Sequence, residues 1–192
     1  MSWEILIIIV VWLSFFSFWI IASFIYRTSK AKKVDKKWFH ILIFIILFTA
    51  LVEYLTWEYL LKRFELPSPF NQIINLIGII LLLVGFFFAI WARLTLGKFW
   101  SGSIAIIEGQ PIIRQGPYSI ARHPIYTGVV AMLWGSFFVA KIGFLLLITI
   151  LGTILLIWKA KFEEVLLEKY KGEEYAAYKK EIRGMFLLKY LC

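Results

Sequence analysis

The chain has 192 residues, of which 61% are hydrophobic and only 17% are charged, and its mean hydropathy is +0.83. These values exclude a disordered chain and argue against an ordinary soluble domain. The 21 Lys and Arg residues outnumber the 12 Asp and Glu residues, which gives a formal charge of +9. In a membrane protein such an excess sets the topology and attracts anionic lipid, so it is no indication of nucleic-acid binding.

Five apolar runs predict five transmembrane helices, at residues 5–26, 38–61, 70–91, 124–140 and 142–158. The first run is too long for the core of a signal peptide and lacks a basic start, so we expect a retained helix. The last two runs are separated only by Lys141, which predicts a tight helical hairpin over 124–158. The sequence after residue 158 predicts an amphipathic C-terminal helix. The expected fold class is therefore all-α, a polytopic membrane protein forming a single membrane domain over 1–192.

Basic residues are distributed unevenly between the loops. If the loop at 27–37 is cytoplasmic, that side carries 18 Lys and Arg residues and the other side carries 3. This asymmetry predicts an N-terminus outside and a C-terminus in the cytoplasm. The two cytoplasmic segments, 93–123 and 159–192, are too short for a separate nucleotide-binding domain. The chain has no G-x-G-x-x-G and no P-loop, so any cofactor site must be built from these segments and the helix ends.

The segment 116–128 is predicted to bind an anion at the start of a helix. Pro124 is well placed as the first residue of the fourth helix, with His123 at or beside its N-cap. The free amides of that helix start, together with Arg122 and His123, would receive an anionic group. The alternative is a proline-started helix with an interfacial Arg-His anchor. Gly128 lies on a small-residue face that allows close approach of another helix or a flat ligand.

Two adjacent acids follow the hairpin. With apolar residues three, four and seven positions further on, Glu163 is predicted on the apolar face of its helix and Glu164 on the wetter one. A buried carboxylate needs a partner, either a cationic ligand or a basic residue. An ion pair with Arg122 or Arg114 is the structural alternative to a ligand site.

Taken together these residues resemble a known family. Three patterns carry the resemblance: Arg122-His123-Pro124-x-Tyr126-x-Gly128, Glu163-Glu164-x-x-Leu167 and Gly172-x-x-Tyr175-x-x-Tyr178. They resemble motifs of the isoprenylcysteine carboxyl methyltransferase family, to which the phospholipid methyltransferases are related. Leu96-Gly97-x-x-Trp100-Ser101 resembles the segment that precedes them. The resemblance covers about residues 91–188, whereas the N-terminal helices match in hydrophobicity only.

The resemblance implies an integral membrane enzyme that uses S-adenosylmethionine. Residues 1–92 would then form three N-terminal membrane helices, and residues 93–192 the catalytic half with a cofactor pocket on the cytoplasmic side. The helix start at His123 and Pro124 suits the cofactor's carboxylate, and Glu163 or Glu164 suits its ammonium. The expected cofactor-binding residues are Trp100, Tyr118, His123, Pro124, Tyr126, Gly128, Glu163 and Glu164.

The expected chemistry depends on the acceptor. A carboxylate is already ionised and needs no general base, but it needs a cation to orient it, and Arg93, Arg114 and Arg183 are candidates. An amine would need deprotonation, which gives His123 or a carboxylate a larger role. The expected catalytic residues are Arg122, His123, Glu163, Arg93 and Arg183. We expect no metal.

The leading functional hypothesis is methyl transfer to a lipophilic acceptor, most like O-methylation of an isoprenylcysteine carboxylate. The alternatives are N-methylation of a phospholipid amine, a sterol-type reductase, which would need more helices, and a non-catalytic scaffold or transport subunit. Expected partners are a lipophilic or prenylated substrate and membrane lipid, with no nucleic acid. The sequence leaves open the natural acceptor, the oligomeric state, and the roles of Glu53 and Cys192.

Overall fold

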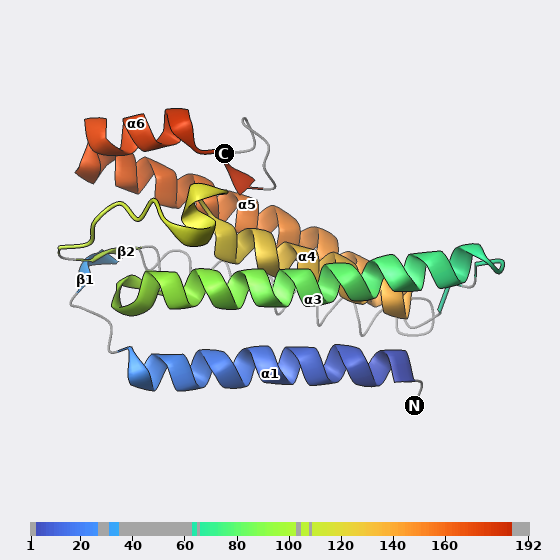
Figure 1. Cartoon of the computed structure of the whole chain (residues 1–192). Helices are drawn as coiled ribbons and strands as arrows, with labels where there is room; N and C mark the ends of the chain where they lie inside the picture. Colours follow the sequence, from blue (N-terminus) through green and yellow to red (C-terminus); the bar gives the residue numbers. More distant parts are fainter. Residues whose placement is uncertain are drawn as a thin grey trace.

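Five α-helices make up most of the structure, a computed structural model that describes residues 3–26, 31–34, 63–64, 66–102, 105–107 and 109–185. The helices are α1 (Trp3–Ile25), α3 (Phe70–Leu96), α4 (Pro124–Ala140), α5 (Gly143–Lys171) and α6 (Glu173–Glu181). Figure 1 shows α1, α3, α4 and α5 lying along one another, with α6 over the far end of α5. The predicted helix at 38–61, with Glu53, lies outside the described residues, as does Cys192.

Among the described residues, three helices are long and apolar enough to cross a membrane: Trp3–Ile25, Phe70–Phe99 and Gly143–Lys171. Helix α4 is apolar too but has only 17 residues. Many large apolar side chains of α1 and α3 face outward, as lipid-facing helices require. The chain is thus an integral membrane protein. Its fifth predicted helix does not end at residue 158 but continues to Lys171, where Gly172 with φ +52° turns the chain into α6.

Glycines bring α3 and α4 together. A Cβ at Gly85 would lie 2.5 Å from the Gly128 carbonyl oxygen, and one at Gly128 would lie 2.6 Å from the Gly85 carbonyl oxygen. Two turns further along α4, a Cβ at Gly135 would lie 2.6 Å from the Gly78 carbonyl oxygen. Only residues without a side chain allow backbones to approach this closely. Gly78 and Gly85 of α3 therefore serve the packing of α3 against α4.

A polar network closes the end of the bundle where α1 and α3 begin. Lys141 joins α4 to α5 in the left-handed conformation, φ +53°, which confirms the tight hairpin. Its buried ammonium donates to the side-chain oxygen of Asn75 and to the Phe138 carbonyl. The Asn75 amide in turn donates to Glu4 of α1 at 3.1 Å. The network satisfies a buried cation and links three helices.

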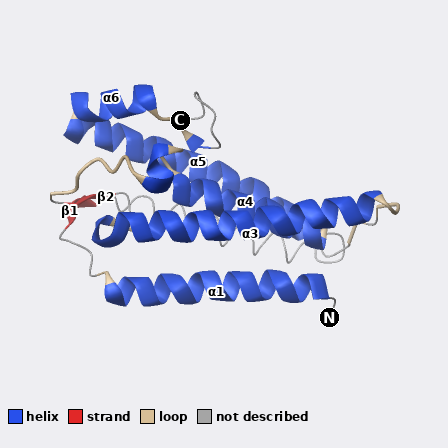
Figure 2. Ribbon diagram, viewed as in Figure 1, coloured by secondary structure: helices blue, strands red, loops and turns tan. Residues whose placement is uncertain are grey.

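The described part of the chain is all-helical, as predicted, apart from one small antiparallel pair of strands that was not predicted. Strand β1 (Ala31–Val34) follows α1, and strand β2 (Ala105–Ile107) follows α3. Figure 2 shows this pair in red at the end of the bundle opposite the chain's N-terminus. The pairing places the segment after α1 beside the segment after α3, at the same end of the bundle.

Candidate functional site

A pocket lies at the end of the bundle where α3 ends and α4 begins. The short 3₁₀-helices η1 (Gly97–Phe99) and η2 (Gly116–Ser119) flank it. Its cavity volume is about 130 Å³. The described residues that line it are Leu96, Phe99, Trp100, Ser101, Gln110, Tyr118, Arg122, His123, Pro124, Ile125, Tyr126, Glu163, Leu166 and Leu167. Six of the predicted cofactor-binding residues, all except Gly128 and Glu164, therefore lie on one pocket.

The start of α4 forms one wall. His123 is the N-cap residue and Pro124 the first helical residue, as predicted. The first intrahelical bond runs from the Thr127 amide to the His123 carbonyl at 3.0 Å. The amides of Ile125 and Tyr126 precede that bond and have no acceptor within the helix. These amides and the positive end of the helix favour an anionic group in the pocket.

Glu163 supplies the pocket's negative charge. Tyr126 donates a hydrogen bond of 2.5 Å to Glu163 Oε1, a length typical of a hydroxyl bound to an ionised carboxylate. The other carboxylate oxygen lies 3.7 Å from His123 Nδ1. The His123 and Tyr126 rings are stacked with their planes 4° apart. The three residues form a connected group in which the half-buried Glu163 carboxylate lines the pocket.

Glu164 is enclosed by cations, contrary to the expectation that it would lie on the wetter face. It is 2% exposed, whereas the Glu163 side chain is 22% exposed. Arg122 Nε donates to Glu164 Oε1 at 2.8 Å, and His123 Nε2 lies 3.2 Å from the same oxygen. Lys179 Nζ of α6 lies 2.9 Å from Oε2. Glu164 is therefore a structural anion that ties α5 to α6 and to the segment before α4.

Lys179 was missed by the sequence analysis. Although partial burial lowers the pKa of its ammonium, the hydrogen bonds that it donates to Glu168 and Glu164 raise this pKa overall. The helix periodicity of α5 could not reveal Lys179, because the contact depends on the turn at Gly172 that folds α6 back over α5. The signal in the sequence was the excess of lysines in the tail.

A group of tyrosines forms a second chamber beside the pocket, with a volume of about 70 Å³. Tyr118, Tyr175 and Tyr178 line it, and it shares Leu96, Gln110, Tyr118, Arg122 and Leu167 with the first cavity. Tyr178 donates to the Tyr118 carbonyl at 2.7 Å. Burial raises the pKa of Tyr178 to about 12, against the opposing effect of Arg122 and Arg114, and raises the pKa of Tyr175 and Tyr118 as well. These phenols are neutral at physiological pH.

The hydroxyl of Tyr175 is buried and has no hydrogen-bond partner among the described residues. A buried hydroxyl without a partner is costly, so a water or a ligand atom is the expected partner. The sequence analysis quoted Tyr175 in its motif but did not place it in the site.

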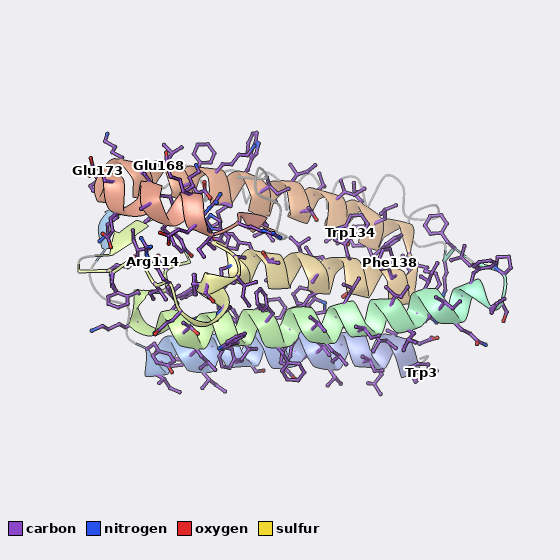
Figure 3. The ribbon with its side chains drawn as sticks, turned by 45° about the horizontal axis from the view of Figure 1, so that its top comes forward. Trp3, Arg114, Trp134, Phe138, Glu168 and Glu173 are labelled. Carbon is purple, nitrogen blue, oxygen red and sulfur yellow. The ribbon has the colours of Figure 1, made fainter. Side chains whose placement is uncertain are left out.

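Four predicted site residues lie away from the pocket. Gly128 packs against Gly85 and Ala89 of α3, not against a ligand space. Arg93 is fully buried behind the pocket wall. Arg114 pairs with Glu181 at 2.7 Å on the surface, where Figure 3 shows it at the charged end of the molecule. The side chain of Arg183 is exposed, and its carbonyl accepts a bond from the Arg122 amide.

Comparisons with known proteins identify the family of the chain. A family model described as phospholipid methyltransferase matches residues 73–174, more than half of the chain. The match spans nearly all of α3, all of α4 and α5, and the start of α6. A 40-residue stretch is also 35% identical to the uncharacterized protein YpbQ of Bacillus subtilis (strain 168), covering 21% of this chain and 24% of that protein. The chain thus matches about a quarter of the length of this relative, whose name specifies no activity.

Proposed function

We propose that this chain, which belongs to the phospholipid methyltransferase family, methylates a lipophilic acceptor in the pocket at the start of α4, with S-adenosylmethionine as the donor. This is the family of isoprenylcysteine carboxyl methyltransferase-like membrane methyltransferases. The observation that supports the proposal is that Glu163 and the start of α4 line the same pocket. A position that binds a cation, Glu163, and a position that binds an anion, the α4 helix start, together match the zwitterionic end of an amino-acid cofactor.

The residues present fit this cofactor. Glu163 would pair with the ammonium, and the Ile125 and Tyr126 amides would bind the carboxylate. The unpartnered hydroxyl of Tyr175 would bind a polar atom of the adenosyl part. The two cavities, of about 130 and 70 Å³, are smaller than the roughly 300 Å³ at which ligand pockets begin. Side chains at the mouth must therefore move apart, or part of the cofactor must remain outside the enclosed space.

Bound S-adenosylmethionine supplies a methyl group activated by the adjoining sulfonium. Methyl transfer is an in-line displacement, so the protein's task is to position the reactants and exclude water. The aromatic rings of Tyr126, Tyr118 and Trp100 present π faces to a cation in the pocket. Leu166 and Leu167 give the α5 wall an apolar surface suited to a lipid chain. The pocket would lie on the cytoplasmic side, from the distribution of basic loops.

The acceptor that we propose is an isoprenylcysteine-type carboxylate, because the resemblance of residues 91–188 is to enzymes of that class and a carboxylate needs no base. A phospholipid amine is the second candidate. It is favoured by the contact between His123 Nδ1 and Glu163 Oε2, 3.7 Å apart, since an imidazole beside a carboxylate can accept the proton that an amine must lose.

Isothermal titration with S-adenosylhomocysteine tests the cofactor pocket. We expect wild-type protein in detergent to bind and Glu163→Gln to weaken binding by about 10- to 100-fold, the loss expected when a charge-assisted hydrogen bond is removed. Glu168→Gln is the matched control, because Glu168 is on the same helix but contacts only Lys179 at the surface. Equal affinity of wild type and Glu163→Gln would reject the assigned site. Transfer of labelled methyl to a farnesylcysteine analogue or to phosphatidylethanolamine then distinguishes the two acceptors.

A further inference from the structure

Arg93 is a cation buried inside the membrane-embedded bundle, in the last turn of α3. Its side chain has no exposed surface. It donates to the Gly97 carbonyl at 2.8 Å and to the Ala22 carbonyl at 3.4 Å. Within the part of the chain that the structure describes, no carboxylate pairs with it, and its Nε has no hydrogen-bond partner. Such a residue is costly to bury, so its retention needs a reason.

Two carbonyl groups and two aromatic rings around Arg93 offset the cost of burying it. Its two acceptors are carbonyls at the C-terminal ends of α1 and α3, where the helix dipoles favour a cation. Its guanidinium also lies over two rings, 5.3 Å from the centroid of Tyr26 and 4.7 Å from that of Trp100. A planar guanidinium can stack on rings while donating sideways to carbonyls, and a lysine ammonium cannot do both.

Trp100 connects this cluster to the site, because it is one of the residues that line the pocket. Its ring is held by Arg93 on α3 and by an edge-to-face contact with Trp19 of α1, 6.1 Å between centroids. Arg93 itself does not line the pocket. The pocket wall therefore depends on a residue behind it and, through Ala22 and Trp19, on the end of α1.

We propose that Arg93 is a positioning residue that fixes the Trp100 ring as a wall of the cofactor pocket and couples that wall to the end of α1. The proposal rests on the proposed function only for the identity of the ligand. It replaces the expectation that Arg93 orients the acceptor carboxylate, which a fully buried side chain behind the wall cannot do. It also gives α1, which lies outside the region matched by the family, a part in building the site.

The test compares Arg93→Lys with wild type in two backgrounds. Arg93→Lys keeps the charge but loses the stacking and one of the carbonyl bonds, and we expect about tenfold weaker binding of S-adenosylhomocysteine, part of what a desolvated cation–π contact contributes. In a Trp100→Leu background the same change should cost less than twofold, because the ring through which Arg93 acts is gone. Arg63→Lys, at the opposite end of the bundle beside Glu4, is the matched control and should leave affinity unchanged.

A spectroscopic measurement separates positioning from a purely structural role. The ¹⁹F resonance of fluorinated Trp100, assigned by its absence in Trp100→Phe, should shift in Arg93→Lys without ligand. If Arg93→Lys does not fold, Tyr26→Leu serves instead, because it removes the other ring beneath the guanidinium and keeps the charge. An unmoved Trp100 signal in a folded variant, or an equal loss of affinity in both backgrounds, would overturn the proposal. If folded wild-type protein does not bind S-adenosylhomocysteine, the proposed function is rejected, and with it the identity of the ligand in this proposal.

Discussion

Glu163 and Glu164 are neighbours in sequence with separate tasks in the structure. Glu164 pairs with Arg122 and Lys179 and contacts His123, whereas Glu163 accepts a hydrogen bond from one phenol and faces the pocket. Removing a buried anion leaves its partners unpaired, and that loss is larger than any single hydrogen bond. The consequence is that stability and ligand binding should separate between two adjacent positions.

We therefore expect Glu164→Gln to lower the free energy of unfolding by about 3 kcal/mol, because Arg122 and Lys179 lose their buried counter-charge. Glu163→Gln, whose position is partly open, should stay within about 1 kcal/mol of wild type. Thermal unfolding of both variants in the same detergent, followed by circular dichroism, measures the difference. A larger loss of stability in Glu163→Gln than in Glu164→Gln would contradict the assignment of the two acids.

Ionisation of Tyr178 is expected to make the stability of the folded protein depend on pH in the alkaline range. Its pKa in the folded protein is about 12, above the ordinary value near 10, because its hydroxyl is buried. The folded state thus holds this proton more tightly than the unfolded state, so its contribution to stability is complete below pH 10 and falls as the pH rises toward 12. Melting temperatures between pH 8.5 and 11 should therefore fall, and Tyr178→Phe should show a shallower fall. It will not be flat, because Tyr118, Tyr175 and Lys179 have raised pKa values as well. Parallel curves for wild type and variant would show that Tyr178 does not contribute.

At the residue scale the sequence predicted half of the residues that line the pocket, but not the roles within it. Local patterns placed His123 and Pro124 at a helix start because capping depends on adjacent residues. They misassigned the two glutamates because the environment of Glu164 is set by α6, whose lysine reaches back after the turn at Gly172. Arg93 was predicted to orient the acceptor carboxylate, because nothing local indicates that α1 covers it.

At the scale of the helices, the α3–α4 interface decides where the pocket wall stands. Helix α4 begins at the pocket, and its whole length is held against α3 by contacts between glycine backbones. Apolar lipid offers no hydrophobic drive for such packing, so close backbone approach must supply it. The spacing of the small residues made this interface predictable. The β1–β2 pair was not, because strands of four and three residues leave no periodicity to detect.

Gly85→Ala tests this interface. The new Cβ would lie 2.5 Å from the Gly128 carbonyl oxygen, so the helices must separate. We expect a loss of about 1–3 kcal/mol, the usual cost of overpacking. Gly102→Ala is the control, since its Cβ would meet only Trp100 atoms at 3.6 Å or more. Chemical denaturation in mixed micelles measures both variants, and equal stability of the two would show that the helices are not packed through Gly85.

At the scale of the whole molecule, the two ends of the bundle differ in chemistry. The Glu4–Asn75–Lys141 network closes one end, and the pocket with its charged helices α5 and α6 lies at the other. Figure 3 shows Trp3 at the first end and Arg114, Glu168 and Glu173 at the second. Hydropathy predicted the spans because the bilayer imposes their length. It could not predict the pocket's shape, which arises where three helix ends and two irregular segments meet.

We predict the orientation of these ends from charge. Positively charged loops are retained in the cytoplasm, and the predicted topology assigns 18 of the 21 basic residues to the side that carries the pocket segments. Cys192 is the chain's only cysteine, so it reports the location of the C-terminus without any substitution.

In sealed right-side-out vesicles, we expect a membrane-impermeant maleimide to leave Cys192 unlabelled until the membrane is permeabilised. In inverted vesicles the same reagent should label it at once. Arg63→Cys in a Cys192→Ser background should give the opposite result, because Arg63 contacts Glu4 at the other end of the bundle. Labelling of Cys192 from the outside of right-side-out vesicles would reverse the topology and place the pocket on the outer face, where a cytoplasmic methyl donor could not reach it.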